Sequence, residues 1–270
     1  MLLARVISAV VAVVAILTVL FVLPHEYVTP VIAAIVLAAS WEWSSLARIT
    51  KVPMRIAFAV IVTALCVAVN AFLTESLFWA VLASFAIWWF AAFVMVLRYP
   101  FVMPRWGVIV AAPLTLVPMY VALLSIARFP MHELYLGSGL LLFVLVVIWG
   151  ADVGGYFAGR AMGKRKLAPH VSPNKTWAGV IGGLLASALV GVVGAMIFGI
   201  PVARLVPLCI ATGAISVLGD LMISLFKREA GLKDSGVLFP GHGGLLDRLD
   251  SIGAGVPLFV AGLAIGHGAW

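Results

Sequence analysis

The stretch 224–250 carries polar side chains whose types and spacing suit a chemical reaction. This stretch holds four Lys or Arg, three Asp, one Glu and one His, together with the glycine-rich run PGHGG at 240–244. Carboxylates are the hard oxygen ligands that Mg²⁺ prefers, and Lys and Arg bind phosphate. Only 10% of the whole chain is charged, so this concentration of charge indicates a polar site.

Aspartate is confined to the second half of the chain. The five positions are Asp152, Asp220, Asp234, Asp247 and Asp250. A polar residue recurs every four positions, which predicts a polar stripe on one helix. The stripe comprises Thr212, Ser216, Asp220, Ser224 and Arg228. At about 1.5 Å per residue, Asp220 lies about 10 Å deeper than Lys227, where an ionised carboxylate is costly unless it is paired or binds metal. A functional Asp220 is favoured over a neutral or Arg-paired one that only joins helices.

A helix is predicted to begin beside Asp247 and Asp250, which are three residues apart and are therefore expected to share one face. The glycines before it, at 241, 243 and 244, are expected to leave backbone N–H groups free for a phosphate, which a helix N-terminus also favours. His242 is a candidate general acid, with phosphate contact or loop packing as equal alternatives.

A second polar cluster lies between 149 and 176. Asp152, Tyr156 and Arg160 follow one another at a spacing of four, so they are predicted to share a helix face. The glycines between 150 and 163 are typical of close helix packing. The run SPNKT at 172–176 places Lys175 among hydroxyls at a predicted helix start, which suits phosphate, although the Walker A pattern is absent.

The elements that must position these residues are membrane helices. The chain is 64% hydrophobic, whereas soluble domains carry about 25% charged residues, so lipid is the expected solvent. The sequence predicts an all-α polytopic protein with a transmembrane scaffold at 1–130 and a catalytic region at 131–270. The predicted spans are 5–23, 27–47, 54–73, 76–97, 106–127, 134–158, 176–199, 202–226 and 250–269.

The basic residues predict the orientation. With the N-terminus in the cytoplasm, 15 of the 17 Lys and Arg residues lie on the cytoplasmic side, and only Arg128 and Arg204 lie opposite. This is a strong positive-inside bias. The membrane surface, and not nucleic acid, accounts for most of the net charge of +7, but it does not account for Lys175 or for the basic residues between 227 and 248, which lie among acidic residues and glycines. The first run has no convincing cleavage site, so a helix is favoured over a signal peptide.

Three features outside the polar clusters are interpreted as structural. Glu42 lies near the cytoplasmic end of the second span, and snorkelling or pairing with Arg48 is favoured over a functional buried acid. Two prolines, at 113 and 118, are expected to kink the fifth span. The two cysteines, at 66 and 209, lie in apolar runs and are expected to be small hydrophobic residues without a disulfide.

The stretch 224–250 resembles the signature of the phosphatidate cytidylyltransferase family, also called CDP-diacylglycerol synthases. It fills every fixed position of S-x-F-K-R-x4-K-D-x-G-x2-F-P-x-H-G-G-L-x-D-R-L-D. The runs WGADVGGYFAGR (149–160) and SPNKTWAG (172–179) are similar to the family's upstream blocks. The resemblance covers about 145–255, and the N-terminal half is similar only in being apolar.

This resemblance implies that CTP and phosphatidic acid give CDP-diacylglycerol and pyrophosphate. It also implies Mg²⁺, with a monovalent cation such as K⁺ assisting, and a homodimer. We expect a bacterial inner-membrane protein with its site on the cytoplasmic side. The implied metal ligands are Asp220 and Asp247, with Asp152, Asp234 and Asp250 as supporting or further ligands. The implied groups for triphosphate or lipid phosphate are Lys175, Lys227, Arg228, Lys233 and Arg248. Further expected substrate contacts are Tyr156, Ser172, Asn174, Thr176, Ser224, His242, Gly243 and Gly244.

Two other functions stay open at this point. A CTP-using polyprenol kinase would release CDP instead of a CDP-lipid. A secondary transporter with Asp220 as its ion-coupling carboxylate would need no nucleotide, and it would leave the basic loops and the GHGG run unexplained. A purely structural protein would not need five clustered aspartates.

Overall fold

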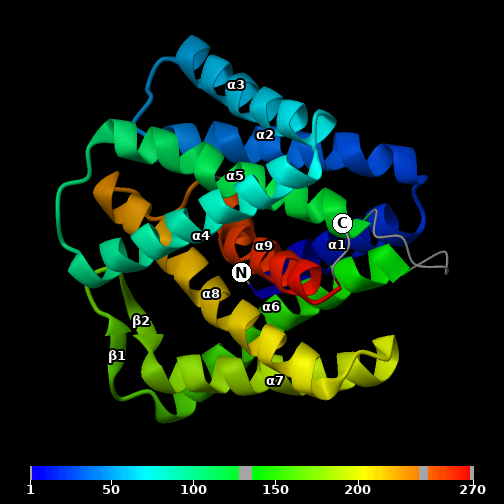
Figure 1. Ribbon diagram of the computed structural model, residues 1–270. Coiled ribbons are helices and arrows are strands. Elements are labelled where there is room, and N and C mark those ends of the chain that lie inside the picture. Colours follow the sequence, from blue (N-terminus) through cyan, green and yellow to red (C-terminus); the bar gives the residue numbers. More distant parts are fainter. Residues whose placement is uncertain (1, 128–135, 237–242, 268–270) are drawn as a thin grey trace.

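The computed structural model describes residues 2–127, 136–236 and 243–267. Nine α-helices and one small sheet lie in these ranges (Figure 1). The helices are α1 (Leu2–Phe21), α2 (Val28–Leu46), α3 (Val52–Ala71), α4 (Glu75–Arg98), α5 (Arg105–Ala127), α6 (Leu136–Met162), α7 (Trp177–Phe198), α8 (Val202–Glu229) and α9 (Leu246–His267). A 3₁₀ turn, η1 (His25–Tyr27), precedes α2, and the strands are β1 (Lys166–Ala168) and β2 (Ser172–Thr176).

The predicted all-α polytopic architecture is confirmed. Among the residues that the structure describes, eight helices, α2 to α9, are long and apolar enough to cross a membrane. Three helices extend beyond the predicted spans on their polar side. α9 begins at Leu246 instead of 250, α6 ends at Met162 instead of 158, and α8 ends at Glu229 instead of 226. α5 runs unbroken through Pro113 and Pro118.

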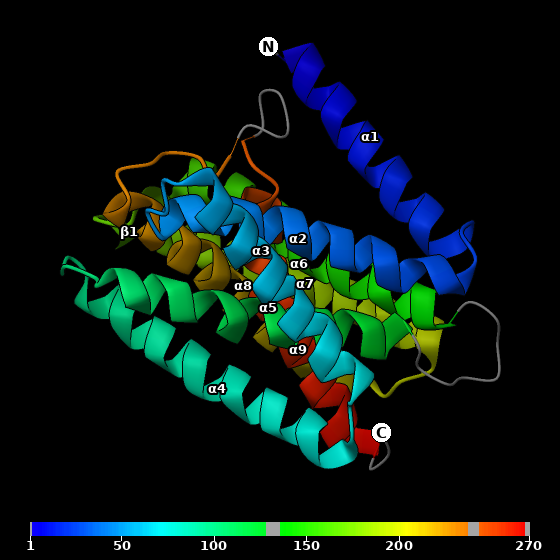
Figure 2. The same ribbon diagram turned by 90° about the horizontal axis from the view of Figure 1, so that it is seen from above.

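The helix α9 occupies the middle of the bundle, between α5 and α8 (Figure 1). Most of α5 and α9 is buried, whereas α3 and α7 expose most of their apolar length, as expected for helices that face lipid. α1 extends away from the other helices (Figure 2). Since α5 and α2 of the predicted scaffold both pack against α9, the two predicted regions form one bundle.

Glycines allow two helix pairs to approach closely. Between α6 and α7, a Cβ atom at Gly154 would lie 2.6 Å from the Cβ of Ala186 and 2.7 Å from the carbonyl oxygen of Gly182. Between α8 and α9, a Cβ atom at Gly219 would collide with the carbonyl oxygen of Asp250. The second contact fixes α8 and α9 beside each other at the depth of Asp220.

A β-hairpin between α6 and α7 was not predicted. Its strands pair antiparallel, with Lys166 opposite Thr176 and Ala168 opposite Ser172. The hairpin leads directly into α7, whose N-terminus is capped by the Thr176 hydroxyl accepting from the N–H of Gly179 at 3.1 Å. This placement gives Ser172–Thr176 the extended conformation of a strand instead of that of a loop.

One end of the bundle gathers four loops that are far apart in the sequence. Met103 donates its N–H to the Glu229 carboxylate at 3.0 Å, and Arg48 pairs with the same carboxylate. Arg228 donates to the Val171 carbonyl at 3.3 Å. The loops 47–51, 99–104 and 163–176 and the described parts of the next loop, 230–236 and 243–245, therefore meet at one end, which we call the site end. That the site end faces the cytoplasm stays a prediction.

Candidate active site

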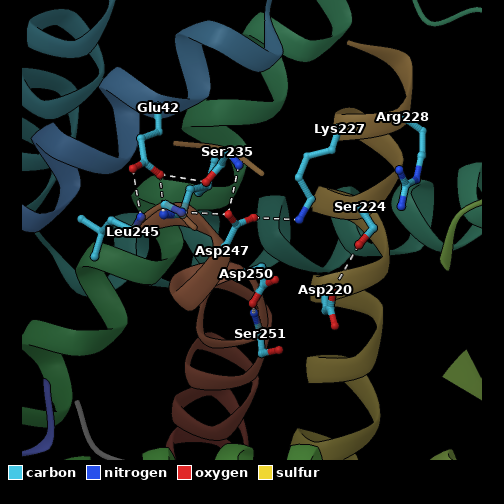
Figure 3. A network of polar contacts seen from close by, with 12 residues as sticks. Glu42, Asp220, Ser224, Lys227, Arg228, Ser235, Leu245, Asp247, Asp250 and Ser251 are labelled. Carbon is cyan, nitrogen blue, oxygen red and sulfur yellow. Dashed lines mark hydrogen bonds and ion pairs between the residues drawn. The ribbon is translucent and has the colours of Figure 1, made fainter. Parts of the chain in front are cut away.

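The first charged pair of the site end joins α8 to the first turn of α9. The Lys227 ammonium lies 2.7 Å from Asp247 Oδ1 (Figure 3). Asp247 Oδ2 accepts from the backbone N–H groups of Ser235 and Gly244, each at 3.0 Å. The two side chains are 14% and 10% exposed. The carboxylate is therefore fully hydrogen-bonded and lies at a helix N-terminus, where negative charge is favoured.

The second charged pair joins β2 to α8. The Lys175 ammonium lies 2.7 Å from Asp220 Oδ2 and 3.4 Å from the Val217 carbonyl oxygen. Asp220 Oδ1 accepts from the Ser224 hydroxyl at 3.1 Å. This bond confirms that Asp220 and Ser224 share the predicted polar face. Farther along the same face, Thr212 and Ser216 are buried and donate to carbonyls of their own helix.

Two further carboxylates, Asp250 and Asp152, lie near these pairs. Asp250 lies below Asp247 and beside Asp220 (Figure 3), and its Oδ1 accepts from the N–H of Ser251 at 2.7 Å. Asp152, Asp220 and Asp250 lie within electrostatic range of one another and of Lys175. Asp247 and Asp250, which were expected to share a face, thus contact different partners. Asp247 binds the loop and Lys227, and Asp250 faces α8.

Glu42 belongs to this site, whereas the sequence favoured snorkelling or pairing with Arg48 over a functional buried acid. Its carboxylate accepts from the Ser235 hydroxyl at 2.8 Å, and from the N–H groups of Leu245 at 2.9 Å and Leu246 at 2.8 Å (Figure 3). The predicted snorkelling is wrong because Glu42 is only 6% exposed. The predicted pairing with Arg48 is also wrong, because Arg48 binds Glu229 instead.

In the described part of the glycine-rich run, the backbone N–H groups bind carboxylates of the protein and are not free for phosphate as predicted. The N–H of Gly244 was expected to be free for phosphate, but it binds Asp247. The next two N–H groups bind Glu42. Gly243 adopts φ of +82°, and a Cβ atom there would lie 2.7 Å from Asp247 Oδ2. His242 lies outside the described residues.

The remaining predicted residues lie around the two pairs with varied exposure. Arg228 binds Val171, and the Tyr156 hydroxyl accepts from Arg160 at 3.0 Å, which confirms their shared face. Thr176 is buried as the cap of α7, and Ser172 is half-buried. The exposed residues of the predicted set are Asp152, Tyr156, Asn174, Arg228, Lys233, Asp234 and Arg248.

The acidic residues do not form a ready metal cage. In the described ranges, no three Asp, Glu, His or Cys side chains lie close enough together to hold a metal ion. Asp220 and Asp247 nevertheless fit Mg²⁺ in kind, because this ion is usually held by one or two carboxylates while water and substrate phosphates complete its shell. Each of the two carboxylates carries a lysine as its counter-ion in this structure.

Comparison with known proteins shows to which family this chain belongs. Residues 3–265 match the sequence profile of the cytidylyltransferase family. The chain belongs to the cytidylyltransferase family. A phosphatidate cytidylyltransferase of Haemophilus influenzae is 38% identical over 94% of this chain and 96% of its own length. One of Pseudomonas aeruginosa is 40% identical over 92% of each. One of Brucella suis is 46% identical over 45% of this chain.

Proposed function

We propose that this protein is an integral-membrane phosphatidate cytidylyltransferase, which makes CDP-diacylglycerol and pyrophosphate from CTP and phosphatidic acid. The observation that carries this proposal is the near full-length similarity to two proteins of that name. The site end supports it independently, since it offers carboxylates and ammonium groups at one end of a bundle of apolar helices.

The chemistry requires neutralisation more than proton transfer. A phosphate oxygen of the lipid forms a bond to the α-phosphorus of CTP, and the bond from that phosphorus to the bridging oxygen breaks to release pyrophosphate. The attacking phosphate is already an anion, so a strong general base is not needed. Two highly negative groups must instead be brought together in line, which is the task of positioned positive charge.

The two lysine–aspartate pairs are the groups that we assign to this task. We infer that Asp220 and Asp247 hold Mg²⁺, with Asp152, Asp234 and Asp250 as supporting or further ligands. When bound, the ion would offset charge on the phosphates and the leaving group. Lys175 and Lys227 are then proposed to bind phosphate oxygens, together with the basic groups exposed around them. These groups are Arg228, Lys233 and Arg248.

The surroundings of the site are proposed from charge and from substrate chemistry. CTP is soluble and phosphatidic acid lies in the bilayer, so a site at the end of a membrane bundle can receive both. The positive-inside bias supports a cytoplasmic site end in a bacterial inner membrane. Assistance by K⁺ and a homodimer remain predictions from the family resemblance.

The proposal is tested by assaying the purified protein in detergent. CTP, phosphatidic acid and Mg²⁺ are added, and pyrophosphate and lipid product are followed for the wild type, Asp220→Asn and Asp247→Asn. We expect CDP-lipid from the wild type and a loss of at least a hundredfold in each variant, because each loses a proposed metal ligand. Glu75→Gln is the matched control, since this exposed carboxylate lies at the opposite end of α4 from the site-end loop 99–104.

The other outcomes separate the alternatives. Conversion of CTP to CDP with a phosphorylated lipid alcohol would indicate a lipid kinase. A wild type without nucleotide turnover that moves solute in vesicles would favour the transporter. An Asp220→Asn or Asp247→Asn variant with near wild-type turnover would remove that residue from the metal role.

A further inference from the structure

A carboxylate of the scaffold half lies against the loop that leads into α9. Glu42 of α2 accepts hydrogen bonds from Ser235 in that loop and from Leu245 and Leu246 at the start of α9 (Figure 3). Oε2 receives two of these bonds, and Oε1 receives one. The three donors are neutral groups, so backbone and hydroxyl dipoles stabilise this carboxylate, helped by the N-terminus of α9.

The loop is shaped around this carboxylate. A Cβ atom at Gly236 would collide with Glu42 Oε1, and a Cβ atom at Gly244 would collide with Glu42 Oε2. Both glycines therefore permit the backbone to approach a buried acid. Because Gly244 also donates to Asp247, it is held between the two carboxylates, and its role differs from that of a phosphate-binding glycine.

Glu42 and Asp247 hold the same two segments. Ser235 gives its hydroxyl to Glu42 and its N–H to Asp247. At the other segment, Gly244 binds Asp247 while the next two residues bind Glu42. Asp247 Oδ1 is thereby left for Lys227. The direction of the Asp247 side chain thus depends on where Glu42 places the start of α9.

The helix that carries Glu42 is itself firmly fixed. The neighbouring Trp43 is fully buried, donates its indole N–H to the Val108 carbonyl of α5 at 2.9 Å, and packs its ring 5.9 Å from that of Phe226 in α8. Arg55 of α3 donates to the hydroxyls of Ser44 and Ser45, each at 2.8 Å. Glu42 therefore projects from a rigid support that contacts α3, α5 and α8.

We propose that Glu42 is a positioning residue for the reaction. It holds the segments at 235 and 244–246 in place, so that Asp247 points its Oδ1 toward Lys227. This role rests on the proposed function for its effect on turnover, whereas its effect on the loop can be measured without any reaction. Glu42 acts through hydrogen-bond acceptance and not through binding of metal or substrate.

The test compares Glu42→Gln and Glu42→Ala with the wild type. Glutamine has the same shape and keeps one acceptor oxygen, which can serve the two donors at Oε2, while alanine leaves all three donors unpaired. We expect kcat to fall about tenfold for Gln and at least a hundredfold for Ala, with the KM for phosphatidic acid changed less than threefold. The Ser40→Ala variant is the control on the same helix, since this buried hydroxyl has no partner among the described residues.

Hydrogen exchange followed by mass spectrometry supplies the independent measurement. Peptides that cover 233–250 should exchange at least tenfold faster in Glu42→Gln, while peptides of α7 remain unchanged. If Glu42→Ala does not fold, Glu42→Gln alone decides. A Gln variant with wild-type exchange overturns the proposal, and so does one with faster exchange but wild-type kcat. Equal kcat for the Gln and Ala variants also overturns it, because charge would then matter more than geometry.

The two proposals fail in distinguishable ways. If the wild type makes no CDP-lipid, the proposed function is lost. The exchange data then still decide whether Glu42 holds the loop.

Discussion

The two lysine–aspartate pairs have equal lengths but differ in how much water reaches them. The side chains of Lys227 and Asp247 are 14% and 10% exposed, and those of Lys175 and Asp220 are 23% and 31% exposed. Water can replace a lost partner at the second pair far better than at the first. The Lys227–Asp247 pair should therefore contribute more to the free energy of folding, and the Lys175–Asp220 pair should open more readily for a substrate.

This difference predicts unequal costs for the two lysines. Lys227→Met leaves a buried carboxylate without its counter-ion and should destabilise the protein by about 3 kcal/mol. Lys175→Met should cost less than about 1 kcal/mol because Asp220 can be solvated. Thermal unfolding in one detergent, with both variants side by side, measures the two costs. A larger loss for Lys175→Met would contradict the ranking.

At the scale of elements, the contact between α6 and α7 positions the hairpin that carries Lys175. The hairpin leaves α6 at one end and enters α7 at the other, so the separation of these helices sets the place of β2. Gly154 lies where a Cβ atom would be 2.6 Å from Ala186. The adjacent Gly155 has more room, since a Cβ atom there would lie 3.3 Å from the Gly179 carbonyl oxygen.

Two adjacent alanine substitutions should consequently behave differently. Gly154→Ala forces α6 and α7 apart and should destabilise the protein by about 1–3 kcal/mol, the usual cost of overpacking. Gly155→Ala requires a shift of only a few tenths of an ångström and should stay close to wild type. Unfolding temperature and turnover of the two variants provide the comparison. Equal losses of stability in the two variants would show that the contact at Gly154 does not set the separation of α6 and α7.

Several elements could be predicted from the sequence because their signal is local. Long apolar runs revealed the spans, and the four-residue spacing of Asp220 and Ser224 revealed their shared face. The role of Glu42 could not be predicted, because its three partners lie about two hundred residues further along the chain. The hydrogen bond from the Gly244 N–H to Asp247 could not be predicted either, because a sequence does not show whether a backbone N–H already has a partner.

At the scale of the whole molecule, the first half of the chain is more than a support in lipid. Glu42 binds the loop before α9, and the Glu229 carboxylate at the end of α8 receives the N–H of Met103 and the charge of Arg48. Partial burial, together with the negative charge of Glu229, raises the pKa of Tyr99 above its ordinary value. Both ends of the loop 230–245 are thus held by residues from the scaffold half.

The orientation of the whole bundle can be tested by labelling. The two native cysteines are buried, so a single new cysteine reports one position. We expect Arg165→Cys, exposed at the hairpin, to be protected from an impermeant thiol reagent in intact cells and to react in inverted membrane vesicles. Glu75→Cys, at the opposite end of α4 from the site-end loop 99–104, should show the reverse. Labelling of Arg165→Cys from outside would reverse the predicted orientation.

The close contact of Gly219 with the Asp250 carbonyl limits how the site can move. With no side chain between them at this point, α8 and α9 cannot slide past each other or separate without losing that contact, so they act as one rigid body carrying Asp220 and Asp247. The distance between these two carboxylates is then set when the protein folds. Admission of substrate is left to the lysine side chains and the hairpin. Side-chain rotations take picoseconds to nanoseconds and loop motions take nanoseconds to microseconds, whereas displacement of whole helices takes microseconds or longer. Opening of the site should therefore not limit the rate of the enzyme.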